Sequence, residues 1–243
     1  GMTLVKMSTE VQDALSEGTP VVALESTIIA HGLPRPDSLA AAQRFENQIR
    51  AAGATPATVA VLDGVPTVGL SAQQLERIAT EDIDKASVRD LPVVIGKGIS
   101  GATTVASTAS LASLAGIRVF ATGGLGGVHR GANETFDESA DLSILSSTPI
   151  TVVSAGVKSI LDISATLERL ETLSVPVVGF KTGVFPAFWL SESDFSLDWK
   201  VESGAEVAAI MQARDQLGYL HGIVVANPVP HDQQWDPATH DRM

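Results

Sequence analysis

Short runs of apolar residues alternate along the chain with longer stretches in which apolar residues recur every three or four positions. The run PVVAL at residues 20–24 predicts a buried strand, because continuous Val, Ala and Leu suit a strand that is covered on both faces. Residues 37–52 predict a helix that stops at Gly53. Its inward face is expected to carry Leu39, Ala42, Phe45 and Ile49.

The same patterns predict the remaining elements, with a turn at Asp63-Gly64. Strands are expected at residues 58–62, 67–70, 92–95, 117–122, 150–154, 175–180 and 222–226, and helices at 71–79, 103–115, 157–173 and 202–217. Buried strands that alternate with helices predict an α/β fold, in which helices cover both faces of a mostly parallel sheet. No linker interrupts the pattern, so a single domain over residues 1–243 is expected.

The composition is that of a globular protein with an acidic surface. The formal net charge is −12, which disfavours nucleic acid and anionic membranes as partners. A phosphate-bearing substrate would therefore need local positive potential, and the chain has only six lysines. Cysteine is absent, and no apolar run is long enough to span a membrane, so a cytoplasmic protein is expected. Gly1 before Met2 is interpreted as a cloning remnant.

Residues that directly follow the predicted strands are the candidates for a site, because ligands of open α/β sheets bind beyond the carboxyl ends of the strands. Glu25 follows the strand at residues 20–24, and burial there would raise its pKa, as a general acid requires. It could equally accept hydrogen bonds from the next turn. Lys158 lies where a helix is expected to begin, and both the helix dipole and burial favour a neutral, nucleophilic amine. The alternative is that Lys158 extends into solvent.

Three other segments carry weaker signals. Asp137 and Asp141 lie four positions apart and could hold a hard divalent cation on one helix face, although acids in a first helical turn are common without a metal. The loop GKGISG at residues 96–101 matches a dinucleotide-binding pattern. However, no acid occurs from Leu91 to Asn133, so we interpret it as an anion-binding loop. The turn GGLGGVHRG contributes His129 as a candidate for proton transfer, or as part of a structural turn. The sequence patterns of zinc proteases, α/β-hydrolases and P-loop proteins are absent.

Six longer segments together carry a family resemblance. They are ALESTIIAHGLPRP (23–36), PATVAVLDG (56–64), SGATTVASTASLASLAGIRVFATGGLGGVHRG (100–131), FDESADL (136–142), VSAGVKSILDISATLERLETL (153–173) and VVANPVP (224–230). The chain resembles the pseudouridine-5'-phosphate glycosidases, also called indigoidine synthase A-like proteins, over about residues 11–230. Members of that family continue beyond VVANPVP with further helices and an Asn-rich segment, so the chain is expected to be either truncated at its C-terminus or a divergent member.

The resemblance implies a glycosidase or lyase of nucleotide catabolism, which reversibly cleaves pseudouridine 5'-phosphate to uracil and ribose 5-phosphate. It implies that Glu25 is the proton donor and that Lys158 is the nucleophile, which forms an adduct with the sugar. It also implies one Mn²⁺ per subunit, held at Asp137, and a homotrimer. The substrate-binding positions implied are Lys85, Val105, Ser139, Ala140 and Asp141.

Two other functions remain open at this stage. The motif at residues 96–101 is compatible with an oxidoreductase that uses a nicotinamide cofactor. The early end of the sequence is compatible with a non-catalytic paralogue that binds sugar phosphates.

Overall fold

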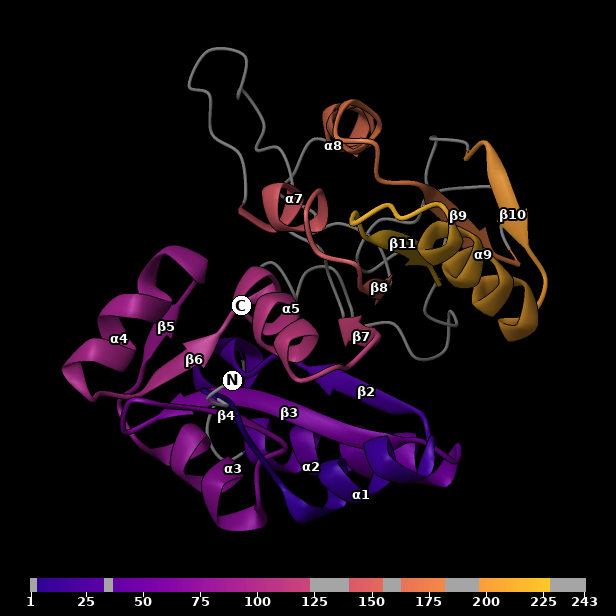
Figure 1. Cartoon of the computed structure of the whole chain (residues 1–243). Coiled ribbons are helices and arrows are strands. Elements are labelled where there is room, and N and C mark those ends of the chain that lie inside the picture. Colours follow the sequence, from indigo (N-terminus) through magenta and orange to yellow (C-terminus); the bar gives the residue numbers. More distant parts are fainter. Residues whose placement is uncertain (1–3, 33–36, 123–139, 155–162, 182–196, 228–243) are drawn as a thin grey trace. The chain divides into compact units, whose positions relative to one another are not determined.

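A computed structural model of the chain describes residues 4–32, 37–122, 140–154, 163–181 and 197–227. It consists of two compact units, Gly1–Phe120 and Ala121–Met243 (Figure 1). Both units alternate strands with helices, and most of the strand pairs are parallel. The predicted α/β class with a mostly parallel sheet is therefore confirmed. The expectation of a single domain over residues 1–243 stays a prediction.

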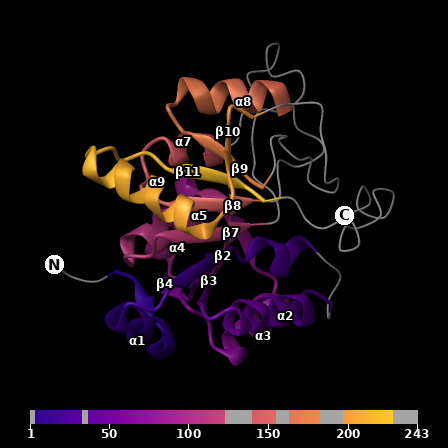
Figure 2. The same ribbon diagram turned by 90° about the vertical axis from the view of Figure 1, so that its right-hand side faces the viewer.

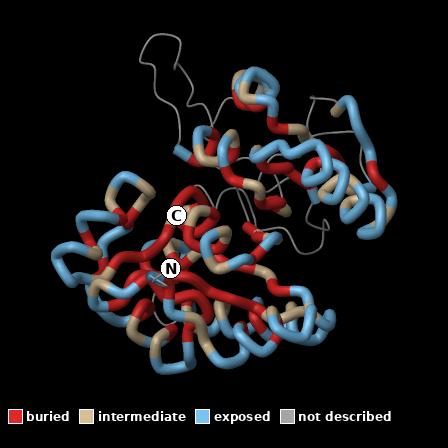
Figure 3. The backbone as a smooth tube through the Cα atoms, viewed as in Figure 1, coloured by how far each residue is buried: buried red, intermediate tan, exposed pale blue. Residues whose placement is uncertain are grey.

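The first unit is organised around β3, Thr55–Leu62, which is buried along nearly its whole length (Figure 3). The first half of β3 pairs in parallel with β2, Val21–Leu24, and its second half pairs antiparallel with β4, Val65–Val68. Asp63 and Gly64 join β3 to β4, and both have positive φ, +51° and +79°. A two-residue hairpin with a type I′ turn requires this conformation, so the predicted turn is confirmed.

Short strands extend the first unit on both sides. β1, Lys6–Met7, pairs with β4, while β7, Val119–Thr122, pairs with β2. β6, Gly101–Thr103, pairs antiparallel with the second half of β3, and β5, Asp84–Ala86, pairs in parallel with β6. The carboxyl ends of β2 and β6 are followed by the polar residues that form the candidate site.

Helices cover both faces of the first unit. α1, Thr9–Glu17, α2, Asp37–Ala51, and α3, Ala72–Thr80, lie on one face (Figures 1 and 2). α5, Val105–Leu114, packs against β2 and β3 on the other face (Figure 1). The core under α2 and α3 is built from Ile29, Ala30, Ala60, Leu62, Leu70, Leu75, Ile78, Ala79, Ile83 and Ala102.

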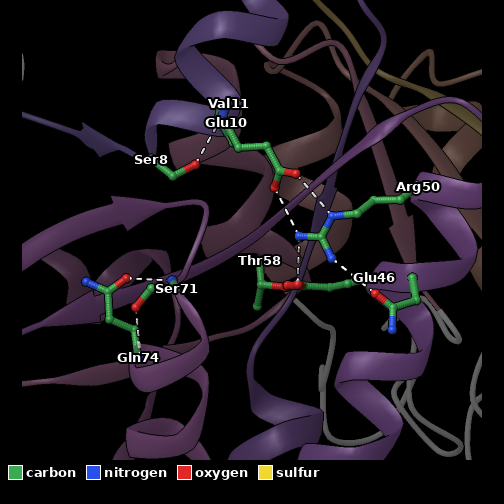
Figure 4. Close-up of polar contacts among 9 residues, drawn as sticks. Ser8, Glu10, Val11, Glu46, Arg50, Thr58, Ser71 and Gln74 are labelled. Carbon is green, nitrogen blue, oxygen red and sulfur yellow. Dashed lines mark hydrogen bonds and ion pairs between the residues drawn. The ribbon is translucent and has the colours of Figure 1, made fainter.

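The inward face of α2 differs from the prediction at one position. Phe45 is 52% exposed, whereas the neighbouring Glu46 is buried. Thr58 on β3 donates a hydrogen bond to Glu46 Oε2 at 2.7 Å, and Arg50 donates to Oε1 at 3.4 Å while it also binds Glu10 on α1 (Figure 4). The prediction for Phe45 was wrong because these partners satisfy a buried carboxylate at a place where periodicity alone expects an apolar side chain.

Burial raises the pKa of Glu46 above its ordinary value of 4.5, against the smaller opposing effects of the Thr58 hydrogen bond and the Arg50 charge. The folded protein therefore holds this proton more tightly than the unfolded chain does. Between the unfolded and folded pKa values the contribution of Glu46 to stability is lost as the pH rises. We expect the melting temperature of the wild type, relative to that of Glu46→Gln, to fall as the pH rises from 4.5. Glu76→Gln, at an exposed position of α3, is the control, and parallel curves for wild type and Glu46→Gln would contradict the prediction.

Residues 92–95 do not form the predicted strand. They lie in helix α4, Leu91–Lys97, which has Pro92 in its first turn and ends at Gly98 with φ +69°. A proline is well tolerated in a first turn, because the N–H that it lacks has no intrahelical partner there, and glycine readily adopts the left-handed end. A short apolar run does not by itself distinguish a strand from a helix. In α4 only Leu91 and Val94 are buried, while Val93 is 57% exposed. A brief 3-10 turn at Val88–Asp90 leads into α4.

Among its described residues, the second unit contains four parallel strands in the order β8-β11-β9-β10. Their bounds are Thr151–Ser154, Ile223–Ala226, Val177–Phe180 and Trp199–Val201. The helices described in this unit are α7, Ala140–Leu145, α8, Ile163–Thr172, and α9, Gly204–Gln216. A small core forms where α9 packs on the strands, with Val178, Val201, Ile223 and Val225 against Val207, Ile210 and Met211.

No helix within the described ranges is both long and apolar enough to cross a lipid bilayer.

Candidate functional site

Glu25 leaves the carboxyl end of β2, as the sequence predicts, and its side chain is half-buried. The Thr27 hydroxyl donates a long hydrogen bond of 3.4 Å to Glu25 Oε2. The chain then enters a π-helical turn, Ile28–Gly32, in which Ile29 and Ala30 are buried in the core. The acid is therefore held between a buried strand and an anchored turn, where its carboxyl group has limited freedom.

The amino end of α5 lies in the same unit, directly after β6. Thr104 is the N-cap of α5, and it exchanges hydrogen bonds with Ser107: the Ser107 N–H donates to Thr104 Oγ1 and the Thr104 N–H donates to Ser107 Oγ. Val105, the first helical residue, is buried. The positive end of the helix dipole and the N–H groups of a first turn favour an anion at such a position.

Hydroxyl groups join the end of β2 to the end of β6. The Ser26 N–H donates to the Thr103 carbonyl at 3.2 Å, and the Thr103 N–H donates to Ser26 Oγ at 2.8 Å. Both residues are fully buried. Glu25 precedes Ser26, and the cap of α5 follows Thr103. The two paired residues therefore set the position of the acid relative to the anion-favouring turn.

Lys85 occupies β5, next to this turn. Its partner in the parallel register is Ala102 on β6, and its side chain is exposed. Ser107 Oγ donates a hydrogen bond of 2.6 Å to the carbonyl of the next residue, Ala86. The first turn of α5 is thus tied to the strand that carries the lysine. The structure brings Glu25, Lys85 and Val105 into one network of neighbouring elements, and their chemical roles stay predictions.

The contact between β5 and β6 depends on a residue without a side chain. A Cβ atom at Gly101 would lie 2.8 Å from Ala86 Cβ, and both residues are buried. We expect Gly101→Ala to destabilise the fold by about 1–3 kcal/mol, which overpacking typically costs, and to lower activity because β5 shifts with Lys85. Thermal melting and an activity assay measure the two effects.

Gly96→Ala is the matched control for this substitution, because a Cβ atom there meets no atom within 4 Å and Gly96 lies in α4. It should be neutral or mildly stabilising, since alanine is the better helix former. Equal melting temperatures for the two variants would contradict the proposed crowding.

Of the acidic segment that contains Asp137 and Asp141, the structure describes only the part from Ala140 onward. Ala140 and Asp141 open α7; Ala140 is exposed and Asp141 is buried. Lys158, Asp137, Ser139 and His129 lie outside the described residues. Within the described ranges, no three His, Asp or Glu side chains gather as metal ligands would. A buried carboxylate at Asp141 has the oxygen chemistry that a hard divalent cation prefers.

Residues 96–101 do not lie between a strand and a helix, as the sequence had predicted, and their interpretation as an anion-binding loop stays a prediction. Gly96 and Lys97 belong to α4, Gly98 ends that helix, and Gly101 starts β6, so the motif follows a helix and not a strand. The dinucleotide pattern therefore lacks its structural context.

Sequence reasoning missed Ser26, Thr103, Ser107 and Thr108, which are all fully buried and hydrogen bonded. The run TTVAST, with a hydroxyl residue three positions after another, carries a signal of capping at the start of α5. It carries no signal of the long-range bond to Ser26.

Comparison with known proteins gives concordant matches. A sequence model described as indigoidine synthase A like protein matches residues 10–243. Pseudouridine-5'-phosphate glycosidase of Frankia alni is 61% identical over 244 residues, which cover 100% of this chain and 68% of the relative. The enzyme of the same name from Escherichia coli is 52% identical over 229 residues, with 93% and 73% covered.

Two solved structures share the fold. The prealnumycin C-glycosynthase AlnA, in complex with ribulose 5-phosphate, superposes with a TM-score of 0.90 at 39% identity, over 98% of this chain and 78% of that chain. An indigoidine synthase A-like protein from Thermotoga maritima superposes with a TM-score of 0.89 at 35% identity, over 100% and 80%.

Proposed function

Because the chain belongs to the indigoidine synthase A-like family, we propose that it reversibly cleaves pseudouridine 5'-phosphate to uracil and ribose 5-phosphate. The observation that carries the proposal is 52–61% identity to relatives named pseudouridine-5'-phosphate glycosidase, over 93–100% of this chain. The resemblance found in the sequence motifs is thereby confirmed. The activity named for the relatives is a C-glycosidic cleavage, which this chain is proposed to share.

Glu25 and Lys158 take the two chemical roles in this proposal. Lys158 Nζ forms a bond to C1' of the ribose, while the bond between C1' and uracil C5 breaks and its electron pair moves to C5. Glu25 donates a proton to C5 as this bond breaks, because a carbanion is a poor leaving group. Water releases ribose 5-phosphate from the lysine. The proton set free in this step passes to solvent, from which Glu25 is protonated again. The half-buried place of Glu25 at the end of β2 supports the acid role.

The phosphate of the substrate is proposed to bind at the first turn of α5 with help from Lys85. N–H groups of a helical first turn and a nearby ammonium group both favour an anion. The formal net charge of −12 makes such a local positive site necessary. Ser139, Ala140 and Asp141 are proposed to complete substrate binding, and the burial of Asp141 supports a specific rather than a solvated role.

A divalent cation, Mn²⁺, is proposed to bind at Asp137, with Asp141 four positions along the chain as a further oxygen donor. The ion would contribute positive charge to substrate binding. Dialysis against a chelator should abolish uracil release, and added Mn²⁺ should restore it. Full turnover after the chelator has removed all bound metal would contradict this.

The family resemblance also leads us to propose a cytoplasmic homotrimer. Light scattering after size-exclusion chromatography measures the mass directly, and three times 25.3 kDa is the expected value.

Uracil release from pseudouridine 5'-phosphate in the presence of Mn²⁺ tests the main proposal. A second assay measures the reverse reaction, the formation of pseudouridine 5'-phosphate from uracil and ribose 5-phosphate. A chain that binds ribose 5-phosphate but releases no uracil would instead be a sugar-phosphate-binding paralogue. C-glycoside synthesis, as the name of AlnA indicates for that protein, is less favoured here because the identity to AlnA is only 39%.

A further inference from the structure

Thr103 is fully buried, and all of its polar groups are hydrogen bonded. Its N–H and carbonyl both bind Ser26. Its hydroxyl donates to the Val59 carbonyl at 2.7 Å and lies 2.8 Å from Thr108 Oγ1, which donates to it. The same hydroxyl lies 3.2 Å from Ser26 Oγ.

Counting protons fixes the direction of every bond around this hydroxyl. A threonine hydroxyl has one proton and two acceptor sites. The proton of Thr103 is used on the Val59 carbonyl, so Ser26 and Thr108 must both donate to Thr103 Oγ1. The oxygen then has one donated and two accepted bonds, which is its full capacity. Rotation of the side chain would break three bonds at once inside a buried site.

The position of Thr103 in the chain links this hydroxyl to the candidate chemistry. Ser26 follows Glu25, and Thr104, the N-cap of α5, follows Thr103. Val59 belongs to the central strand β3, and Thr108 lies in the second turn of α5. One buried oxygen therefore bonds to the acid-bearing loop, to the helix whose first turn favours an anion, and to the strand beneath both.

We propose that Thr103 is a positioning residue for catalysis, which through Ser26 and Thr108 fixes the distance between the Glu25 carboxyl group and the phosphate-binding turn of α5. The inference rests on the proposed function, because it is the substrate that must meet both groups at once. A displacement of either group by about 1 Å lowers the reaction rate strongly, even when the protein still folds.

Three variants test the proposal. Thr103→Val keeps the shape of the side chain and removes the hydroxyl, and Thr103→Ser keeps the hydroxyl. Thr67→Val is the matched control, because Thr67 is also a buried strand threonine whose hydroxyl donates to a single carbonyl, that of Val65, at 3.0 Å. The melting temperature of each variant is measured first. Then kcat and KM for pseudouridine 5'-phosphate and the affinity for ribose 5-phosphate are measured well below it.

We expect Thr103→Val to lower kcat by about 100-fold, as a misplacement of about 1 Å does elsewhere. Thr103→Ser should keep kcat within about three-fold of the wild type, because the same bonds re-form. Thr67→Val should lower the melting temperature without changing kcat. A wild-type kcat in Thr103→Val, with only the melting temperature reduced, would overturn the positioning role and leave a structural one.

The failure of the proposed function would be visible separately, as absence of uracil release by the wild type. Calorimetric titration with ribose 5-phosphate then decides the role of Thr103 in binding alone. Weaker binding by Thr103→Val, restored in Thr103→Ser, would support a link between Thr103 and the α5 turn, and equal binding by all variants would overturn it.

Discussion

Lys158→Ala is expected to abolish uracil release, with a loss of kcat of about 10⁴-fold or more, as removal of a nucleophile typically produces. Without the amine, no bond forms at C1' of the ribose, and the single-step departure of a carbanion has too high a barrier. Mass spectrometry of the wild type after incubation with ribose 5-phosphate should show one added sugar phosphate on the peptide that contains Lys158. The variant should show none.

Lys200→Ala is the control for this loss. Lys200 is another lysine of the chain, half-exposed and paired with Glu202 at 3.3 Å, and exposed pairs contribute little to stability. It should keep wild-type turnover and the mass shift. If Lys158→Ala also kept full turnover, the covalent route would be wrong, and the substrate would have to react without a lysine adduct at this position.

The sequence predicted those parts of the fold where one signal dominates. The strand expected at residues 20–24 is observed as β2. The helix expected from Asp37 is observed as α2, because a 3.6-residue period sustained over 15 residues favours a helix. The segment 92–95 was misassigned because a run as short as VVI suits a strand and a helix equally, and the deciding features were the flanking Pro92 and Gly98.

Positions fixed by long-range partners could not be predicted. Glu46 is buried because Thr58 and Arg50 satisfy it, and Thr58 is a distant residue on another element. The periodicity of α2 contains no information on that partner, so Phe45 was placed inward in error. Short strands such as β5 and β6 were missed for the same reason, since three residues carry too little pattern and pairing across the sheet decides them.

The residues of the candidate site show the same difference between positions set by local sequence and positions set by distant partners. The place of Glu25 at the end of a buried strand was predictable, and its role as a site residue stays a prediction that rests on where ligands bind in this class of fold. The place of Thr103 was not predictable, because nothing in its local sequence indicates that it meets Ser26, 77 positions away. The chemical groups of a site follow from local sequence more readily than the residues that hold those groups in place.

Glu25→Gln is expected to lower kcat by about 10²–10⁴-fold, which is the usual contribution of a general acid. The amide has nearly the shape of the carboxyl group and its oxygen still accepts from Thr27, so the loop should keep its structure and KM should change little. What the amide lacks is a transferable proton for uracil C5. Thr27→Val, which removes only the long bond to Glu25, should lower kcat far less.

The same variant separates the acid from the nucleophile. Since Lys158 is unaffected in Glu25→Gln, ribose 5-phosphate should still form the lysine adduct, and mass spectrometry should detect it. Pseudouridine 5'-phosphate should bind, and no uracil should be released. An adduct with ribose 5-phosphate but no turnover would assign proton donation to Glu25 and bond formation to Lys158. Loss of the adduct in Glu25→Gln would instead mean that the carboxyl group acts earlier, in the attack of the amine, and that a different group protonates the base.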